Sequence, residues 1–77
     1  MQKFSVVIAG KHYTSISLEE EFYRQLNILA LEQHRPINDL ITEVDKTRTI
    51  PNLSSALRLY VLRTLLQKLE EKEELSD

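Results

Sequence analysis

The segment Tyr13-Thr14-Ser15-Ile16-Ser17-Leu18 decides the fold of this 77-residue chain. Apolar and hydroxyl-bearing residues alternate along it, so an extended strand would place Ile16 and Leu18 on one face. The β-branched side chains of Thr14 and Ile16 favour a strand over a helix. We therefore predict a β-strand with one buried face and one polar face, the polar face being formed by Tyr13, Ser15 and Ser17.

A second alternating segment, residues 4–8, precedes the first. Gly10, the only glycine of the chain, lies between the two segments, where the three-residue turn Ala9-Gly10-Lys11 would close a hairpin. The register of that hairpin places three residue pairs on one face, as a stable hairpin requires. These pairs are Ile8 with His12, Val6 with Thr14, and Phe4 with Ile16.

Two helices are predicted after the second strand. Ser17-Leu18-Glu19-Glu20 has the spacing of a capping box at the start of the first helix. That helix should end near Gln33-His34, because Arg35 precedes a proline and such residues are biased away from helix. The second helix should run from about Pro36, which is tolerated in a first turn, to about Arg48.

A third helix is predicted to begin at Leu53, with Asn52 as its N-cap. Its apolar residues are too many for one packing surface, so a second subunit is the expected further neighbour. From Glu70 onward acidic residues accumulate at the carboxyl end, where the helix dipole disfavours them, and we expect fraying. The predicted domain therefore spans residues 1–69 and is followed by an acidic tail over residues 70–77.

The composition excludes several classes of protein. The chain is 42% hydrophobic and 29% charged, which is typical of a globular domain. It has no cysteine, so disulfides and thiolate metal sites are excluded, and its two histidines lack ligand spacing. We predict no metal and no cofactor, and with so few loops to hold a catalytic site we predict no enzyme. His12, on the apolar strand face, is predicted to be a hydrogen-bonded structural residue.

The size and the apolar pattern predict a soluble dimer. A chain this short buries only about 60% of the surface that its unfolded form exposes, so oligomerisation is the expected source of further stability. No apolar run approaches the ~20 residues of a membrane span. The apolar patch near the amino terminus is too short for a secretory signal, so we expect a cytoplasmic protein.

The charge is unevenly distributed. Residues 1–17 contain two lysines and no acid, residues 53–69 contain three unopposed cations, and residues 70–77 have a net charge of −4. The folded part without the tail is +2, which is only mildly basic for a nucleic-acid-binding protein. Three cations of the third helix could flank DNA phosphates, form ion pairs with Glu43 or Asp45, or be solvated. The ion-pair or solvated role is favoured. These cations are Arg58, Arg63 and Lys68.

A strand, a helix, a short turn and a helix on a small cysteine-free chain resemble the ribbon-helix-helix family. The closer resemblance is to its short bacterial single-domain members, which share Thr-Ser-Ile-Ser-Leu-Glu (residues 14–19) and Asn-Leu-Ser-Ser-Ala-Leu-Arg (residues 52–58). The resemblance implies a mainly α fold with a short β-ribbon, in an intertwined homodimer with a third C-terminal helix and a possible extra N-terminal strand. It also implies sequence-specific DNA binding by the paired strands in a small transcriptional regulator.

The resemblance further implies a set of DNA-binding residues. Tyr13, Ser15 and Ser17 would point toward the bases, and Lys11 and Arg35 would contact phosphates. Tyr13 stands where the family group often has arginine, which reads guanine with two hydrogen bonds. The turn before the second helix lacks the glycine that is common there.

Two alternatives remain open at this point. If residues 4–8 pair with residues 12–18, a dimer would have a four-stranded sheet, which is broader than the roughly 12 Å major groove. Either the first strand folds away or the sheet is an assembly platform. The alternative function is a non-enzymatic homodimeric interaction module, or an antitoxin-like protein whose C-terminal tail binds a partner.

Overall fold

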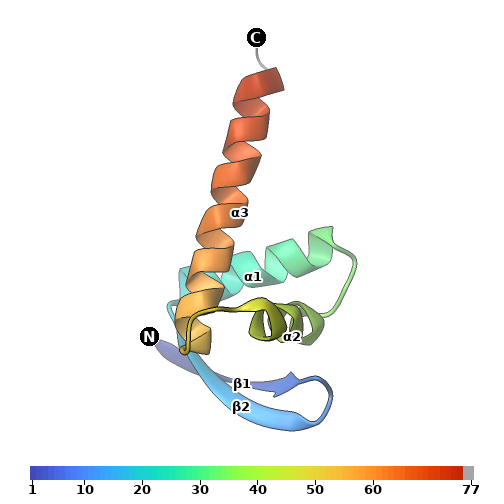
Figure 1. Ribbon diagram of the computed structural model, residues 1–77, viewed down its shortest axis with the longest axis vertical. Helices are drawn as coiled ribbons and strands as arrows, with labels where there is room; N and C mark the ends of the chain where they lie inside the picture. The colour runs from blue at the N-terminus through green and yellow to red at the C-terminus, as the bar shows by residue number, and fades with distance from the viewer. Residues whose placement is uncertain (76–77) are drawn as a thin grey trace.

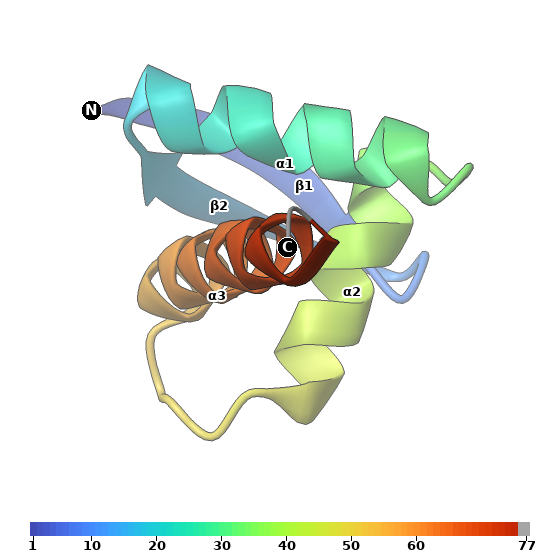
Figure 2. The same cartoon turned by 90° about the horizontal axis from the view of Figure 1, so that it is seen from above.

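The computed structural model describes residues 1–75, which form a hairpin covered by three helices (Figure 1). The elements are β1 (Gln2–Ile8), β2 (His12–Leu18), α1 (Glu20–Glu32), α2 (Ile37–Thr47) and α3 (Leu53–Leu75). Helices α1 and α2 lie across one face of the hairpin, and α3 rises away from it, as the view from above also shows (Figure 2). The predicted mainly helical fold with a short β-ribbon and a third helix is confirmed.

The hairpin has the predicted register. β1 pairs with β2 in antiparallel fashion, from Gln2 opposite Leu18 to Ile8 opposite His12. At the turn Ala9 and Gly10 have φ angles of 55° and 69°, and the Lys11 N–H donates to the Ile8 carbonyl over 3.1 Å. Glycine accepts a positive φ without steric cost, which explains its place here. The predicted extra N-terminal strand therefore exists, and one chain forms a two-stranded ribbon by itself.

The hydrophobic core lies between the hairpin and the helices. From β2 it takes Ile16 and Leu18, which are 1% and 0% exposed, so the predicted inward face is confirmed. Phe4 of β1 stacks on Tyr23 of α1, with ring centroids 3.7 Å apart. The other buried apolar residues are Val6, Leu26, Leu29, Ala30, Leu40, Ile41, Val44, Ala56, Leu57 and Val61.

Two predictions about the hairpin and the first helix are wrong. Ser17 does not cap α1, because it remains in β2, and the helix begins only after Glu19. His12 is exposed, because it lies beside the turn, where its cross-strand neighbour Ile8 is only half buried. The end of α1 and both ends of α2 lie within two residues of the predicted positions, and His34 has the positive φ, 55°, that ends the first helical segment.

Helix α3 starts as predicted but continues further. The Asn52 Oδ1 accepts a hydrogen bond from the Ser55 N–H at 2.9 Å, as expected of an N-cap. The helix extends through Leu75, because glutamate, lysine and leucine are good helix formers, and the fraying expected from Glu70 onward stays a prediction. Residues 76 and 77 of the predicted tail lie outside the described residues.

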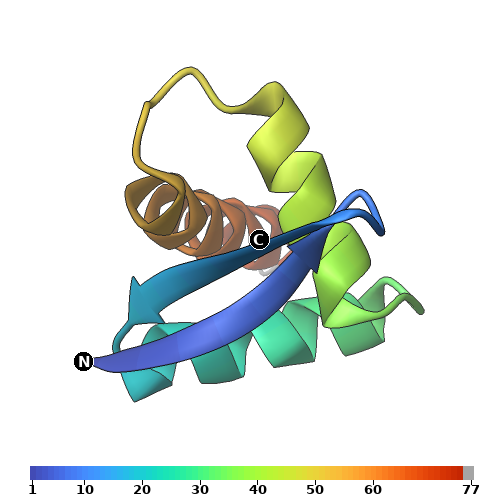
Figure 3. The same ribbon diagram turned by 90° about the horizontal axis from the view of Figure 1, so that it is seen from below.

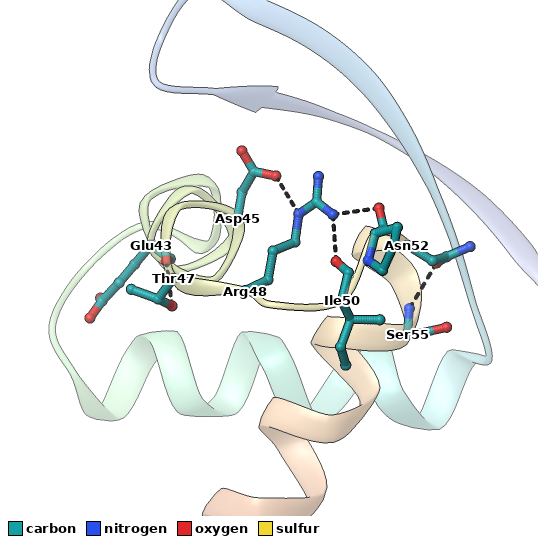
Figure 4. A network of polar contacts seen from close by, with 8 residues as sticks. Glu43, Asp45, Thr47, Arg48, Ile50, Asn52 and Ser55 are labelled. Atoms are coloured by element: carbon teal, nitrogen blue, oxygen red, sulfur yellow. Dashed lines mark hydrogen bonds and ion pairs between the residues drawn. The ribbon is translucent and has the colours of Figure 1, made fainter.

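The α2–α3 linker is held by one arginine, as Figure 4 shows. Arg48 Nε donates to Asp45 Oδ1 at 2.9 Å, and its Nη1 donates to the carbonyls of Ile50, at 2.6 Å, and Pro51. The side chain thereby satisfies two carbonyls that no helix pairs. This clamp fixes where α3 begins relative to α2.

Replacing the buried strand residue Ile16 with alanine should destabilise the fold. The Ile16→Ala change removes apolar contacts from a site that cannot fully collapse, and should lower the free energy of unfolding by about 2–5 kcal/mol. Urea denaturation followed by circular dichroism measures this. Ser15→Ala, one residue away on the other face, should shift it by less than about 0.5 kcal/mol. Equal effects of the two variants would contradict the assignment of the faces.

Candidate nucleic-acid interface

Figure 3 shows the hairpin from the side that points away from the helices. Strand alternation gives this outer face, as we call it, Lys3, Ser5, Val7, Tyr13, Ser15 and Ser17. Tyr13 is 84% exposed and Ser15 is also exposed, whereas Ser17 is half-buried. Two of the three predicted base-facing residues are therefore exposed, and the third lies close to α3.

The charged side chains of the hairpin are all cationic. Residues 1–18 contain Lys3 and Lys11 and no acidic residue. Lys11 lies exposed in the turn, and Lys3 lies on the outer face opposite Ser17. Hydroxyl groups with flanking cations are suited to base edges with flanking phosphates. The fold thus brings Lys11, Tyr13 and Ser15 together, and Lys3 adds a cation that was not among the predicted site residues.

One end of the β2 edge is covered by α3. The Ser17 N–H donates to Ser54 Oγ at 3.0 Å, and Arg58 Nη2 donates to the Ser17 carbonyl at 3.1 Å. In an antiparallel pair, backbone groups point to the same edge at every second residue, so those of Ser15 and Tyr13 point the same way. Within residues 1–75 no hydrogen bond covers this edge at Tyr13 and Ser15. A short stretch of β2 is therefore left available for pairing.

Arg58 of α3 contacts both the end of β2 and Glu19, the N-cap residue of α1. Besides the Ser17 carbonyl, its guanidinium binds Glu19, with Nε 2.9 Å from Oε1. The hydrogen bond from Arg58 holds the pKa of Glu19 below its ordinary value. The prediction that Arg58 would pair with Glu43 or Asp45 is wrong. Those two carboxylates pair with Arg35 and Arg48 instead.

Arg35 is not brought together with the other predicted DNA-binding residues. It belongs to the turn between α1 and α2, and Figure 1 shows that this turn lies on the helical side of the hairpin and not on its outer face. Its Nε donates to Gln33 Oε1 at 2.9 Å, and its guanidinium forms an ion pair with Glu43. A phosphate contact by Arg35 stays a prediction, and it would have to compete with this ion pair.

Sequence reasoning missed the role of Ser54 at this site. The Asn-Leu-Ser-Ser stretch indicated only the start of a helix, and nothing in its pattern pointed to β2. The contact arises because the α2–α3 linker places the first turn of α3 beside the end of the strand. A serine in the first turn of a helix signals a hydrogen bond to a nearby backbone group, but the sequence does not identify which group that is.

The geometry defines a small β-ribbon protein whose ribbon is backed by helices. The family model described as a ribbon-helix-helix domain matches residues 1–65, so the chain belongs to the ribbon-helix-helix family. Members of that family are generally DNA-binding transcriptional regulators or antitoxins. Comparison with curated proteins and with solved structures gave no match. Among residues 1–75, no helix is long and apolar enough to cross a membrane, and no group of side chains has the makeup of a metal site.

The Glu19–Arg58 pair should make stability depend on pH in the acidic range. Because the folded state lowers the pKa of Glu19, the stabilisation is fully present above the unfolded pKa and is lost as pH falls through the folded one. Thermal melting of Glu19→Gln should therefore differ from wild type at neutral pH, and the two melting temperatures should converge as the pH falls through the folded pKa of Glu19. Glu21→Gln serves as the control on an exposed glutamate. A constant difference at every pH would contradict the role of the carboxylate.

Proposed function

We propose that this protein is a sequence-specific DNA-binding protein, a small cytoplasmic transcriptional regulator that acts as a homodimer. The observation that carries the proposal is the outer face of the hairpin. It combines exposed Tyr13 and Ser15 with Lys3, and Lys11 lies in the adjoining turn; residues 1–18, the ribbon of a ribbon-helix-helix domain, contain no acid.

The proposed dimer forms through the uncovered stretch of β2. Antiparallel pairing of Tyr13 and Ser15 with the same residues of a second copy would satisfy the outward backbone groups. The two β2 strands then become the centre of a four-stranded sheet, with both copies of Ser15 on the same face. Such pairing is self-complementary, as a two-fold interface must be.

The width of that sheet suggests how it would contact DNA. Four strands at ~4.8 Å spacing span about 14 Å between the outer strand axes, which exceeds the roughly 12 Å major groove. We therefore expect the two central β2 strands to approach the bases, while the outer β1 strands lie over the phosphate backbones. This arrangement gives Lys3 a phosphate contact and leaves base recognition to Tyr13 and Ser15.

Selection of bound sequences from random duplex DNA tests the proposal directly. A two-fold dimer should enrich a palindrome, because each protomer contacts one half-site. Ser15→Ala should then weaken binding to the selected duplex by about 1–2 kcal/mol and change binding to scrambled DNA little. Lys11→Ala should weaken both and lower the salt dependence by about one counterion per chain.

Thermal melting is the control for these variants. Both residues are exposed, so neither substitution should alter the melting temperature. Fluorescence anisotropy at two salt concentrations measures the affinities. If no duplex binds better than another even at low salt, the proposal of sequence-specific binding fails.

Arg35 provides a separate test of phosphate contacts near the α1–α2 turn. Glu43→Gln removes its ion-pair partner and should raise DNA affinity several-fold, because the released guanidinium becomes available for a phosphate. Adding Arg35→Ala to the same variant should abolish that gain. If the double variant keeps the higher affinity, removal of the acid alone explains it, and Arg35 does not contact DNA.

The second candidate function is a non-enzymatic protein-interaction module or an antitoxin-like protein, which retains the fold without recognising bases. The observation that favours it is Tyr13, a largely exposed aromatic beside the uncovered β2 edge. Aromatic residues are enriched in protein interfaces, and tyrosine cannot form the two hydrogen bonds to guanine that arginine forms. In the antitoxin variant of this candidate, the carboxyl-terminal part of the chain binds the protein partner.

A further inference from the structure

Helix α3 has an apolar stripe that its own chain leaves exposed. Four leucines are 40–55% exposed, although leucine is usually buried: Leu62, Leu65, Leu66 and Leu69. At 100° per residue they fall within an arc of about 100° on one side of the helix. We call these four residues the leucine stripe.

The stripe lies on a different side of α3 from the contacts to the domain. Leu57 and Val61 of α3 are buried in the core. Further along, Lys68 forms an ion pair with Glu32, and Gln33 donates to the Tyr60 hydroxyl at 2.9 Å. These residues point toward α1, whereas the stripe lies beside them on the part of α3 that projects beyond the other helices (Figure 1).

The spacing of the stripe is symmetric. Its intervals of three, one and three residues are the same in both directions along the helix. In an antiparallel pair of copies with Leu65 opposite Leu66, Leu62 therefore lies opposite Leu69, and every leucine meets a leucine. A parallel pair would also align the leucines, so the orientation has to be decided by the charges.

The charges of α3 favour the antiparallel pair. Residues 58–68 contain three cations and no acid, a net +3, whereas residues 70–74 contain four glutamates and one lysine, a net −3. With Leu65 opposite Leu66, antiparallel packing places residues 70–74 of each copy beside residues 57–61 of the other, a stretch that contains Arg58 and no acid. Parallel packing places like charges together, which is unfavourable.

We propose that the leucine stripe binds the leucine stripe of a second copy of this chain, with the two α3 helices antiparallel. This interface is distinct from the proposed pairing of β2 edges. One helix pair is small beside the roughly 1,200–2,000 Å² of a typical stable interface, so we expect a weak association that depends on protein concentration.

Charge substitutions at opposed positions test both the contact and its orientation. Leu62→Lys alone and Leu69→Glu alone should each weaken the stripe-dependent association at least about tenfold, because each places two charges against leucine. An equimolar mixture of the two variants should recover it, since the introduced lysine then faces the introduced glutamate and the other end keeps a leucine pair. Sedimentation velocity across a concentration series measures the assembly.

A matched control is Gln67→Lys, which adds a charge to the same helix away from the stripe and should leave the association unchanged. Circular dichroism should show all variants folded, because the substituted leucines are about half exposed. Mixing that fails to restore association, or recovery only when Leu62→Lys is mixed with Leu62→Glu, overturns the antiparallel assignment. Assembly that is the same in wild type and stripe variants, or absent at every concentration, overturns the second copy as the occupant.

Discussion

The register of the β1–β2 hairpin is the constraint on which the rest of the structure depends. Because side chains alternate along a strand, a slip of one residue would move Ile16 and Leu18 into solvent and place Ser15 against the helices. The turn fixes one end of the register through the positive φ angles of Ala9 and Gly10. At this end the Ala9 N–H also donates to Thr42 Oγ1 of α2 at 3.0 Å. Because burial of Ile16 and Leu18 fixes the inner face, the residues between and beside them, such as Ser15 and Ser17, are placed on the outer face.

The other end of the hairpin is fixed by α3. Ser54 and Arg58 bind the backbone of Ser17, so no further strand can pair with the β2 edge at that point. Only the part of the β2 edge near Tyr13 and Ser15 remains for pairing. The same contacts that stabilise the monomer therefore limit where a ribbon between two copies forms, and they centre it on the residues proposed to approach the bases.

The sequence predicted those parts of the fold that depend on local patterns. Alternation identified both strands and their pairing, the Arg35-Pro36 step located the end of α1, and Asn52 located the start of α3. The failures concern tertiary contacts between distant residues. The Ser17 backbone N–H is bound by Ser54, 37 residues away, and Arg58 binds Glu19, 39 residues away. No local spacing distinguishes those partners from nearer ones such as Glu43.

The candidate site was predictable to the same extent. The outer face followed from alternation, so Tyr13 and Ser15 could be placed on it, whereas the partial burial of Ser17 depends on α3. Arg35 was chosen for its position before a helix, but its environment is set by Glu43, two turns further along the chain. A cation identified from sequence is a phosphate ligand only if no carboxylate of the fold lies closer.

Charge links the two proposed interfaces. In the antiparallel α3 pair, the acidic stretch of one copy, residues 70–74, lies beside residues 57–61 of the other, close to Arg58 and the covered end of β2. Added negative charge there repels DNA phosphates from the neighbouring sheet. Binding through the leucine stripe and binding of DNA through the outer face would then oppose each other, and by linkage each would weaken the other equally. Since phosphates are screened by salt and leucine contacts are not, the antagonism should be strongest at low ionic strength.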